Sequence, residues 1–299
     1  MVHYFAKRLI AALSCALLML LCACAPGNEV PSAPPSSSPG TKNTPGETAR
    51  AQLGEGVWEI VFYATGKSDA ILLLSAQHAL MIDTGYAHSA PHIVNNLKSR
   101  GVEALDYLIL THFDKDHIGG APTLLSSIAV KSILQPVYAE GSDAYVAYES
   151  ALASLALTPT PLTQDTAFTL GDASFTVYAP HLPEYDNENN SSLLISMLHG
   201  ENSLLFAGDA KAKRLEEMLS VPALAHDLLK LPHHGSFNKN TAIFLSAVSP
   251  TYAIITCSEQ DPPDPQTLAT LDLLPTQTYL TTNGPVLCTS NGKTLDVRQ

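Results

Sequence analysis

Four side chains that can bind a metal ion lie within six positions of this sequence: His112, Asp114, Asp116 and His117. They follow the apolar run 105–110, which predicts a buried strand, and they precede Gly119 and Gly120, which allow a tight turn. Imidazole and carboxylate ligands at this spacing can hold two zinc or manganese ions. A polar loop with capping aspartates is the alternative, but four ligands ahead of two glycines favour a metal site.

Two further groups of candidate ligands follow predicted strands in the second half of the chain. Asp209 comes after the apolar run 203–206, so its carboxylate is expected at a strand's carboxyl end, where clefts open in layered α/β folds. A helix-start aspartate is its alternative role. His233 and His234 end the run 228–231. Adjacent side chains on an extended segment point in opposite directions, so we expect only one of them to bind metal. The sequence does not indicate which, and the other would bond a carboxylate or face substrate.

Predicted strands and helices alternate along the chain, in a similar order in its two halves. Strands are predicted at 57–64, 70–75, 79–82, 105–110, 174–178, 192–198, 203–206, 228–231, 252–257, 277–281 and 286–288. Helices are predicted at 88–100, 211–219, 241–247 and 268–274. This order predicts a layered α/β sandwich.

The segment from His112 to His117 resembles the HxHxDH signature of the metallo-β-lactamase superfamily, with Asp114 at the second histidine position. With its two glycines it is similar to the C-terminal hydrolase domain of ComEC-type competence proteins. Other stretches look like the family's remaining motifs, in the family's order: 70–73, 82–85, 189–194, 206–210 and 231–236. The resemblance covers residues 57–297. It implies a four-layer αββα metallo-β-lactamase sandwich, which we expect to occupy residues 52–299.

The resemblance also implies roles for single residues. Two divalent ions, zinc or manganese, are expected, with Asp209 between them. The first would have the ligands Asp116, His117, Asp209 and either His233 or His234. The second would have the ligands His112, Asp114 and Asp209. Catalytic roles are implied for Asp83, Asp116, Asn190 and His234. Asp83 would support the ligands, with a plain turn aspartate as its alternative, and Asn190 stands where relatives with a full site carry a third histidine.

Two stretches differ from the ComEC-like pattern. At 66–70 the sequence is Gly-Lys-Ser-Asp-Ala, where the pattern has Gly-Gln-Gly-Asp-Ala. After the strand predicted at 252–257 the pattern has a His-Pro pair, whereas 259–265 here contain no histidine. Asp261 and Asp264 are candidate replacements by proximity alone. Since the histidine could serve as an acid or a phosphate contact, its absence weighs against a ComEC-type nuclease.

The first 24 residues indicate a secretory signal. Lys7 and Arg8 precede an apolar stretch that ends in the tetrapeptide 21–24, and this tetrapeptide resembles a bacterial lipobox. The resemblance implies cleavage before Cys24 and lipidation of its sulfur; an uncleaved anchor helix is the alternative. Residues 25–51 are rich in Pro, Ser, Gly and Thr, which predicts a flexible tether. We therefore expect the protein at the extracytoplasmic face of a bacterial membrane, attached by lipid only, or secreted.

The formal net charge of −12 bears on the substrate. An acidic chain does not attract nucleic acid over its whole surface, although a cleft with bound metal can override the average. We expect a hydrolase of phosphodiester bonds in a polymer, either DNA, which charge does not support, or a surface polymer. A small-ester hydrolase acting on lactones or thioesters, and a metal-binding surface module with little catalysis, are the alternatives. Cys257 and Cys288 could form a disulfide or remain two buried thiols.

Overall fold

The computed structural model describes residues 49–299, except 139 and 183. The predicted signal segment, the lipidation site Cys24 and nearly all of the predicted tether therefore lie outside the described residues. The described part begins with a short 3-10 helix, η1 (Ala49–Gln52). No helix in this part of the chain is long and apolar enough to cross a membrane.

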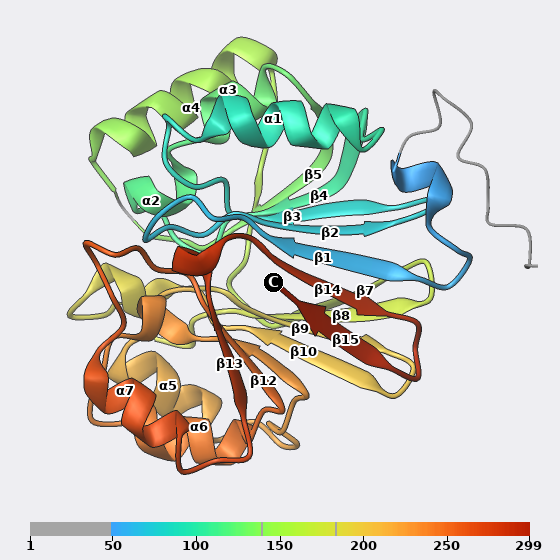
Figure 1. The fold of residues 1–299 in the computed structure, drawn as a ribbon. Helices are drawn as coiled ribbons and strands as arrows, with labels where there is room; N and C mark the ends of the chain where they lie inside the picture. Colours follow the sequence, from blue (N-terminus) through green and yellow to red (C-terminus); the bar gives the residue numbers. More distant parts are fainter. Residues whose placement is uncertain (1–48, 139, 183) are drawn as a thin grey trace, which may run out of the picture. The chain divides into compact units, whose positions relative to one another are not determined.

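Two β-sheets form the middle of the fold (Figure 1). The first has the strand order β15-β14-β1-β2-β3-β4-β5-β6 and the second has the order β13-β12-β11-β10-β9-β8-β7. The first sheet contains β1 (Trp58–Phe62), β2 (Ile71–Ser75), β3 (Ala79–Ile82), β4 (Ala104–Ile109), β5 (Ala129–Gln135), β6 (Thr160–Pro161), β14 (Val286–Ser290) and β15 (Leu295–Arg298). The second contains β7 (Thr166–Leu170), β8 (Ala173–Tyr178), β9 (Leu194–His199), β10 (Asn202–Phe206), β11 (Leu228–Lys230), β12 (Tyr252–Ile255) and β13 (Gln277–Leu280).

Helices cover the outer face of each sheet (Figure 1). The first sheet is covered by α1 (Ala90–Ser99), α2 (Lys115–Ile118), α3 (Ala121–Leu125) and α4 (Asp143–Leu155). The second is covered by α5 (Ala212–Met218), α6 (Thr241–Val248) and α7 (Pro265–Leu271). Three short 3-10 helices lie in loops: η2 (Glu188–Ser191), η3 (Pro232–Gly235) and η4 (Thr281–Asn283). The predicted four-layer αββα sandwich is therefore confirmed.

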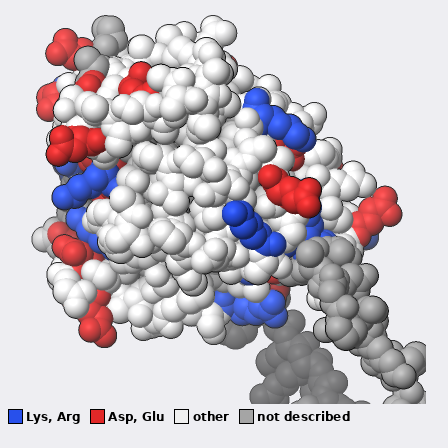
Figure 2. Space-filling model, turned by 90° about the horizontal axis from the view of Figure 1, so that it is seen from above, with Lys and Arg blue, Asp and Glu red and all other residues white. Residues whose placement is uncertain are grey.

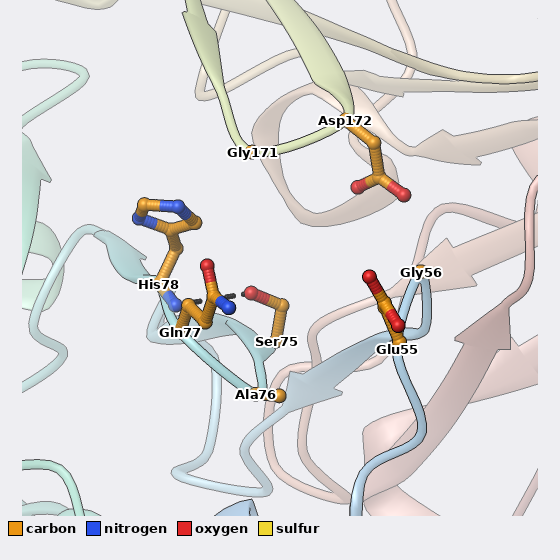
Figure 3. Close-up of a pocket in the computed structure, with 8 residues that line it drawn as sticks. All are labelled: Glu55, Gly56, Ser75, Ala76, Gln77, His78, Gly171 and Asp172. Carbon is orange, nitrogen blue, oxygen red and sulfur yellow. Dashed lines mark hydrogen bonds between the residues drawn. The ribbon is translucent and has the colours of Figure 1, made fainter.

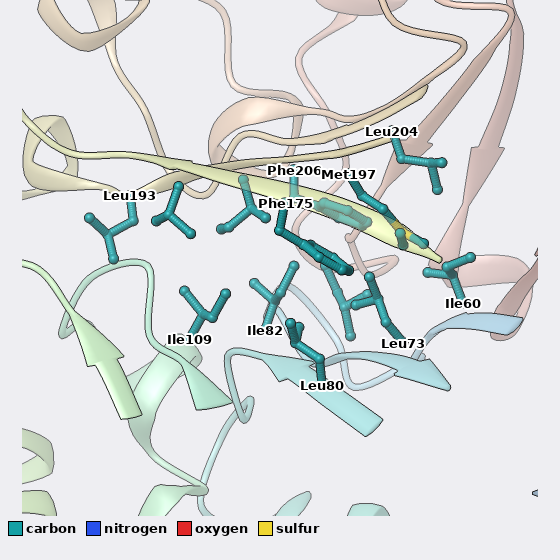
Figure 4. Packing of buried hydrophobic residues seen from close by; sticks show 14 of the residues in the cluster. Ile60, Leu73, Leu80, Ile82, Ile109, Phe175, Leu193, Met197, Leu204 and Phe206 are labelled. Atoms are coloured by element: carbon teal, nitrogen blue, oxygen red, sulfur yellow. The ribbon is translucent and has the colours of Figure 1, made fainter. Parts of the chain in front are cut away.

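Three apolar layers hold the sandwich together. Between the sheets, aromatic and aliphatic side chains such as Phe175, Phe206 and Met197 interdigitate and are buried (Figure 4). Two further clusters fill the spaces between each sheet and its helices. Helix α1 shows how the sequence produces this, since its buried residues recur at helical spacing: Ala90, Ile93, Val94 and Leu97. β2 is buried along nearly its whole length, as a strand between two apolar layers must be.

The element boundaries agree with the predicted ones for most of the chain. Most departures lie between β4 and β8, but β15 was not predicted either, and α7 begins three residues before the predicted helix 268–274. β5, the 13-residue helix α4 and β7 are elements that we did not predict. Helix α4 carries a local start signal, because the Ser142 side chain accepts a hydrogen bond from the backbone N–H of Tyr145. Cys257 and Cys288 are buried free thiols, so of the two alternatives the disulfide is wrong.

Parallel strands in each sheet deliver the polar loops to one edge of the sandwich. β3, β4 and β5 run parallel in the first sheet, and β10, β11 and β12 run parallel in the second. Parallel strands end at the same edge, so the loops that follow β3, β4, β10, β11 and β12 lie together at the end of the fold near α2 (Figure 1).

Candidate metal centre

Four predicted ligands meet at this edge. Asp116, His117, Asp209 and His234 each offer an atom, and the four atoms lie within 4.8 Å of one another. Asp209 is central: its Oδ1 lies 3.2 Å from His117 Nε2, and its Oδ2 lies 3.3 Å from His234 Nε2. His234 Nε2 also lies 3.4 Å from an oxygen of Asp116. Residues that are more than a hundred positions apart in the sequence therefore form one cluster.

Several of the atoms that could bind a metal in this cluster have no hydrogen-bond partner. Within the described part of the chain, His112 Nε2, His117 Nε2, His234 Nε2 and Asp209 Oδ1 are buried and unpaired. Buried polar atoms are normally paired, and imidazole nitrogens that converge with carboxylate oxygens are the usual surroundings of a transition-metal ion. The residues present therefore fit a divalent metal.

His112 and Asp114 form a looser flank of the cluster. His112 Nε2 lies 3.5 Å from an oxygen of Asp114 and 4.0 Å from Asp209 Oδ2. Its ring lies beside that of His117, with 4.0 Å between the ring centroids. Asp114 is 38% exposed, whereas His112 is fully buried. The three predicted ligands of a second ion are thus neighbours, but they are more widely spaced than the first group.

Asp83 holds His117 in position. The Nδ1 of His117 lies 2.7 Å from Asp83 Oδ2, while Asp83 also accepts hydrogen bonds from the backbone N–H and the hydroxyl of Thr111. Since Nδ1–H donates to this carboxylate, Nε2 faces the cluster. Burial lowers the pKa of His117, but Asp209 and Asp83 outweigh it, so the pKa in the metal-free protein is well above the ordinary value.

A buried ion pair that we did not predict lies behind the cluster. The ammonium of Lys230 contacts Asp69 and donates to the Gly208 carbonyl at 3.1 Å. Asp69 also accepts a hydrogen bond of 2.6 Å from the Thr256 hydroxyl. Burial raises the pKa of Asp69, yet Lys230, with smaller contributions from two cluster histidines, brings it below the ordinary value. A lysine inside the apolar run 228–231 was the available sequence signal, because a buried lysine needs a partner.

The two adjacent histidines do not lie on an extended segment. Both have positive φ, 45° at His233 and 52° at His234, and they form the turn η3. The extended geometry that we assumed for them is therefore wrong. His234 donates from Nδ1 to the Thr256 carbonyl at 3.0 Å, which directs its Nε2 into the cluster. His233 lies at the rim, with its Nε2 3.8 Å from Asp209 Oδ2. Burial, Lys211 and Lys67 lower its pKa and outweigh the opposing effect of Asp209, giving a pKa of about 4.

Asn190 is engaged with its own loop. Its side-chain oxygen accepts from the backbone N–H of Arg214, and its amide nitrogen lies 3.4 Å from Asp186. The preceding residue is the one that approaches the cluster, since the amide nitrogen of Asn189 lies 3.5 Å from Asp209 Oδ2. The catalytic role implied for Asn190 stays a prediction. Of the two candidate replacements for the missing histidine, Asp264 caps helix α7 by accepting from a backbone N–H.

Gly119 and Gly120 are required for close packing. Neither has positive φ, but a Cβ on Gly120 would collide with the Thr84 carbonyl oxygen, and one on Gly119 with the Lys115 carbonyl. The Gly120 N–H in turn donates to the Gly85 carbonyl at 2.9 Å. The two glycines therefore bring the loop that carries His117 against the loop that carries Asp83.

A cavity of about 410 Å³ lies away from the metal centre, beside the starts of β1 and β3 and the β7–β8 turn (Figure 3). Its walls include Glu55, His78 and Asp172, which come from three separate loops. These side chains do not form a group of three converging ligands. Asp172 is instead tied to the fold, because it accepts hydrogen bonds from Trp58 Nε1 and from His199 Nε2.

Known proteins share this sequence pattern. A family model described as the Metallo-beta-lactamase superfamily matches residues 64–258. ComE operon protein 3 of Bacillus subtilis (strain 168) is 32% identical over 168 residues, which cover 55% of this chain and 21% of that protein. Recombination protein 2 of Haemophilus influenzae is 27% identical over 216 residues, which cover 71% of this chain and 26% of that protein. The chain thus spans about a quarter of the length of these relatives.

A likeness also exists among solved structures. The metallo-beta-lactamase fold protein YhfI from Bacillus subtilis is 13% identical to this chain, with a TM-score of 0.47. The match covers 74% of this chain and 96% of that one.

Proposed function

Because this chain belongs to the metallo-beta-lactamase superfamily, we propose that it is a metal-dependent hydrolase that cleaves phosphodiester bonds. The observation that carries the proposal is the convergence of unpaired, buried donor atoms from His117, His234 and Asp209. A buried polar atom without a partner is costly, about 1–3 kcal/mol for each group. A divalent ion that binds all of them would compensate this cost.

The surrounding residues prepare the cluster for a cation. Asp83 and the Thr256 carbonyl hold the Nδ1–H of His117 and His234, which directs both Nε2 atoms into the cluster. Burial raises the pKa of Asp116, but His234 and His117 outweigh it and bring the pKa to about 2. This carboxylate is therefore ionised at neutral pH. A bound divalent ion would lower the pKa of a water molecule and polarise a phosphoryl oxygen of the substrate.

Two features support a phosphodiester over an acyl substrate. The cluster and its flank contain three carboxylates, those of Asp114, Asp116 and Asp209. Carboxylate ligands suit manganese, imidazole ligands suit zinc, and metal pairs of this kind serve phosphatases and nucleases. One of the relatives is a recombination protein, which agrees with a nucleic-acid substrate. DNA and a surface polymer that contains phosphodiesters are both compatible with these features.

The location proposed for this activity rests on the sequence. We propose that the hydrolase acts at the extracytoplasmic face of a bacterial membrane, where lipid on Cys24 would anchor it. The segment 1–24 that carries this signal lies outside the described residues. Globomycin treatment, which blocks processing of lipid-modified precursors, should shift the apparent mass of the wild-type protein but not of Cys24→Ala.

A matched pair of aspartate variants tests the hydrolase. The purified protein, loaded with manganese or zinc, should hydrolyse bis(p-nitrophenyl) phosphate. We expect Asp116→Asn to lose activity by about 100-fold or more, because a ligand to the ion is removed. Asp106→Asn is the control, since Asp106 lies near the opposite end of β4 and bonds the exposed Lys131. Equal turnover by Asp116→Asn and the wild type would refute the mechanism.

Two other outcomes would point to the alternatives. Elemental analysis that finds bound metal, together with no turnover of any ester, would favour the metal-binding module. Turnover of a lactone or thioester without turnover of the phosphodiester would favour the acyl hydrolase. Either result would overturn the proposed phosphodiesterase.

A further inference from the structure

A cavity of about 400 Å³ adjoins the metal centre. The residues that line it come from the loop before β9, the start of α5 and the loop after β11, and they include Lys211, Lys213, His233, Ser236, Asn238 and Lys239. His233 belongs to both sites, because it lines the cavity and its Nε2 lies 3.8 Å from Asp209 Oδ2. A ligand in the cavity would therefore be a direct neighbour of one at the centre.

Positive charge dominates this cavity, which we call the lysine pocket. Three lysines and one carboxylate, that of Asp186, line it. Lys213 pairs with Asp186 at 3.3 Å. Among the described residues, no ion pair involves Lys211 or Lys239. Two ammonium groups thus remain for a ligand. Lys211 lines the same cavity as His233, which places its charge beside the centre.

Hydrogen bonds connect the segments that form the walls of the lysine pocket. The amide nitrogen of Asn240 donates to the Ala212 carbonyl at 2.7 Å, which ties the loop after β11 to the start of α5. The Asn238 N–H donates to the Thr241 hydroxyl at 2.9 Å, which fixes the same loop to helix α6. The lysines at the start of α5 and in the loop after β11 are therefore carried by segments that hydrogen bonds already hold in place. Less conformational entropy is then lost when a ligand binds.

The positive charge of the lysine pocket contrasts with the negative net charge of the chain. The chain has a formal net charge of −12. On the face over α1, α3 and α4, basic and acidic side chains are scattered and separated by neutral surface (Figure 2). The cavity at the starts of β1 and β3 has carboxylates in its walls, Glu55 and Asp172 (Figure 3). Lysines gathered beside a carboxylate-rich centre would offset its repulsion of a polyanion.

We propose that the lysine pocket binds the phosphate group that neighbours the scissile one in a polymeric substrate. This inference rests on the proposed phosphodiesterase function and narrows its substrate to a chain with more than one phosphate. Lysine ammonium groups bind phosphate as point charges, and the hydroxyl and amide of Ser236 and Asn238 add neutral donors. A small neutral ester would leave this pocket without a ligand. The repeating phosphate of a nucleic acid or of a polyol-phosphate polymer would fill it.

A pair of dinucleotides isolates the pocket from the centre. Thymidylyl-thymidine has one phosphodiester, and its 5′- or 3′-phosphorylated forms add one neighbouring phosphate to the same scissile bond. For the wild type we expect kcat/KM to be about tenfold higher for one of the phosphorylated forms. In Lys211→Gln/Lys239→Gln this ratio should fall to about one. Lys293→Gln, an exposed lysine in the β14–β15 turn, is the control and should keep the wild-type ratio. A ratio near one in the wild type would overturn the proposal.

A binding measurement separates this inference from the proposed function. Calorimetry with inorganic phosphate and the chelator-treated, metal-free protein should show binding that Lys211→Gln/Lys239→Gln lacks. Binding by the wild type without any phosphodiester turnover would support the pocket and refute the hydrolase. Turnover without phosphate binding and without the substrate preference would refute the pocket alone. A competition experiment identifies the polymer that supplies the phosphate. A thymidine oligonucleotide and a glycerol-phosphate oligomer are each tested as inhibitors of turnover of the phosphorylated dinucleotide. Inhibition by neither polymer would count against the pocket.

Discussion

Lys230→Met should destabilise the metal-free protein strongly. Lys230 is fully buried, and its ammonium group contacts the equally buried carboxylate of Asp69 and the carbonyl of Gly208. Methionine keeps most of the apolar stem but removes the charge, so the carboxylate is left buried without its cation. Removal of one partner of a buried pair costs about 3–5 kcal/mol. For a domain of this size that corresponds to a fall in Tm of roughly 6–20 °C.

The only tryptophan of the chain gives a convenient readout. Trp58 is fully buried in the layer between the sheets, so its fluorescence reports unfolding. Urea titrations should be run with a chelator, so that metal binding does not contribute. Lys131→Met is the matched control, because its ammonium bonds Asp106 while its side chain is 68% exposed. An exposed pair contributes about 0–1 kcal/mol, so this variant should remain close to the wild type.

A double variant tests the assigned cause. In Asp69→Asn/Lys230→Met both charges are absent, so much of the loss should be recovered relative to Lys230→Met alone. The two substitutions would then be strongly non-additive, as expected for groups in contact. A loss in Lys230→Met no larger than that in Lys131→Met would contradict the reasoning. Additive effects in the double variant would show that the Lys230 ammonium stabilises through the Gly208 carbonyl or Asp209 rather than through Asp69.

Two further predictions concern groups that do not line the lysine pocket. Peptide mapping after treatment with a thiol reagent should find Cys257 and Cys288 unmodified in the native protein and modified in urea, because both thiols are buried and burial raises the pKa of Cys288. Burial raises the pKa of Asp172, but hydrogen bonds from Trp58 and His199 outweigh it, so the folded-state pKa lies below the ordinary 3.8. The stabilisation is therefore present above pH 3.8 and lost as pH falls through the folded-state pKa. The Tm difference between wild type and Asp172→Asn should shrink from pH 6 to pH 3; a constant difference would contradict this.

Much of the candidate site could be predicted because its chemistry is concentrated in short motifs. His112, Asp114, Asp116 and His117 are adjacent in the sequence and follow an apolar strand, so their proximity needs only local geometry. The family resemblance, now confirmed, extended this to Asp209 and the distant histidine pair. Helix α4 could also have been predicted from the sequence, because it begins at the capping residue Ser142, but this signal was not recognised.

Only the tertiary structure decided how distant segments pair. Lys230 and Asp69 lie 161 positions apart, and no local pattern links a lysine in one sheet to an aspartate after a strand of the other. The lysine pocket has the same origin, because Lys239 joins Lys211 only when the loop before α6 folds against the start of α5. The positive φ of His233 and His234 likewise follows from the contacts around the turn. Apolar periodicity specifies which face of a strand is buried, whereas the partners of a buried charge depend on which loops the folded sheets bring together.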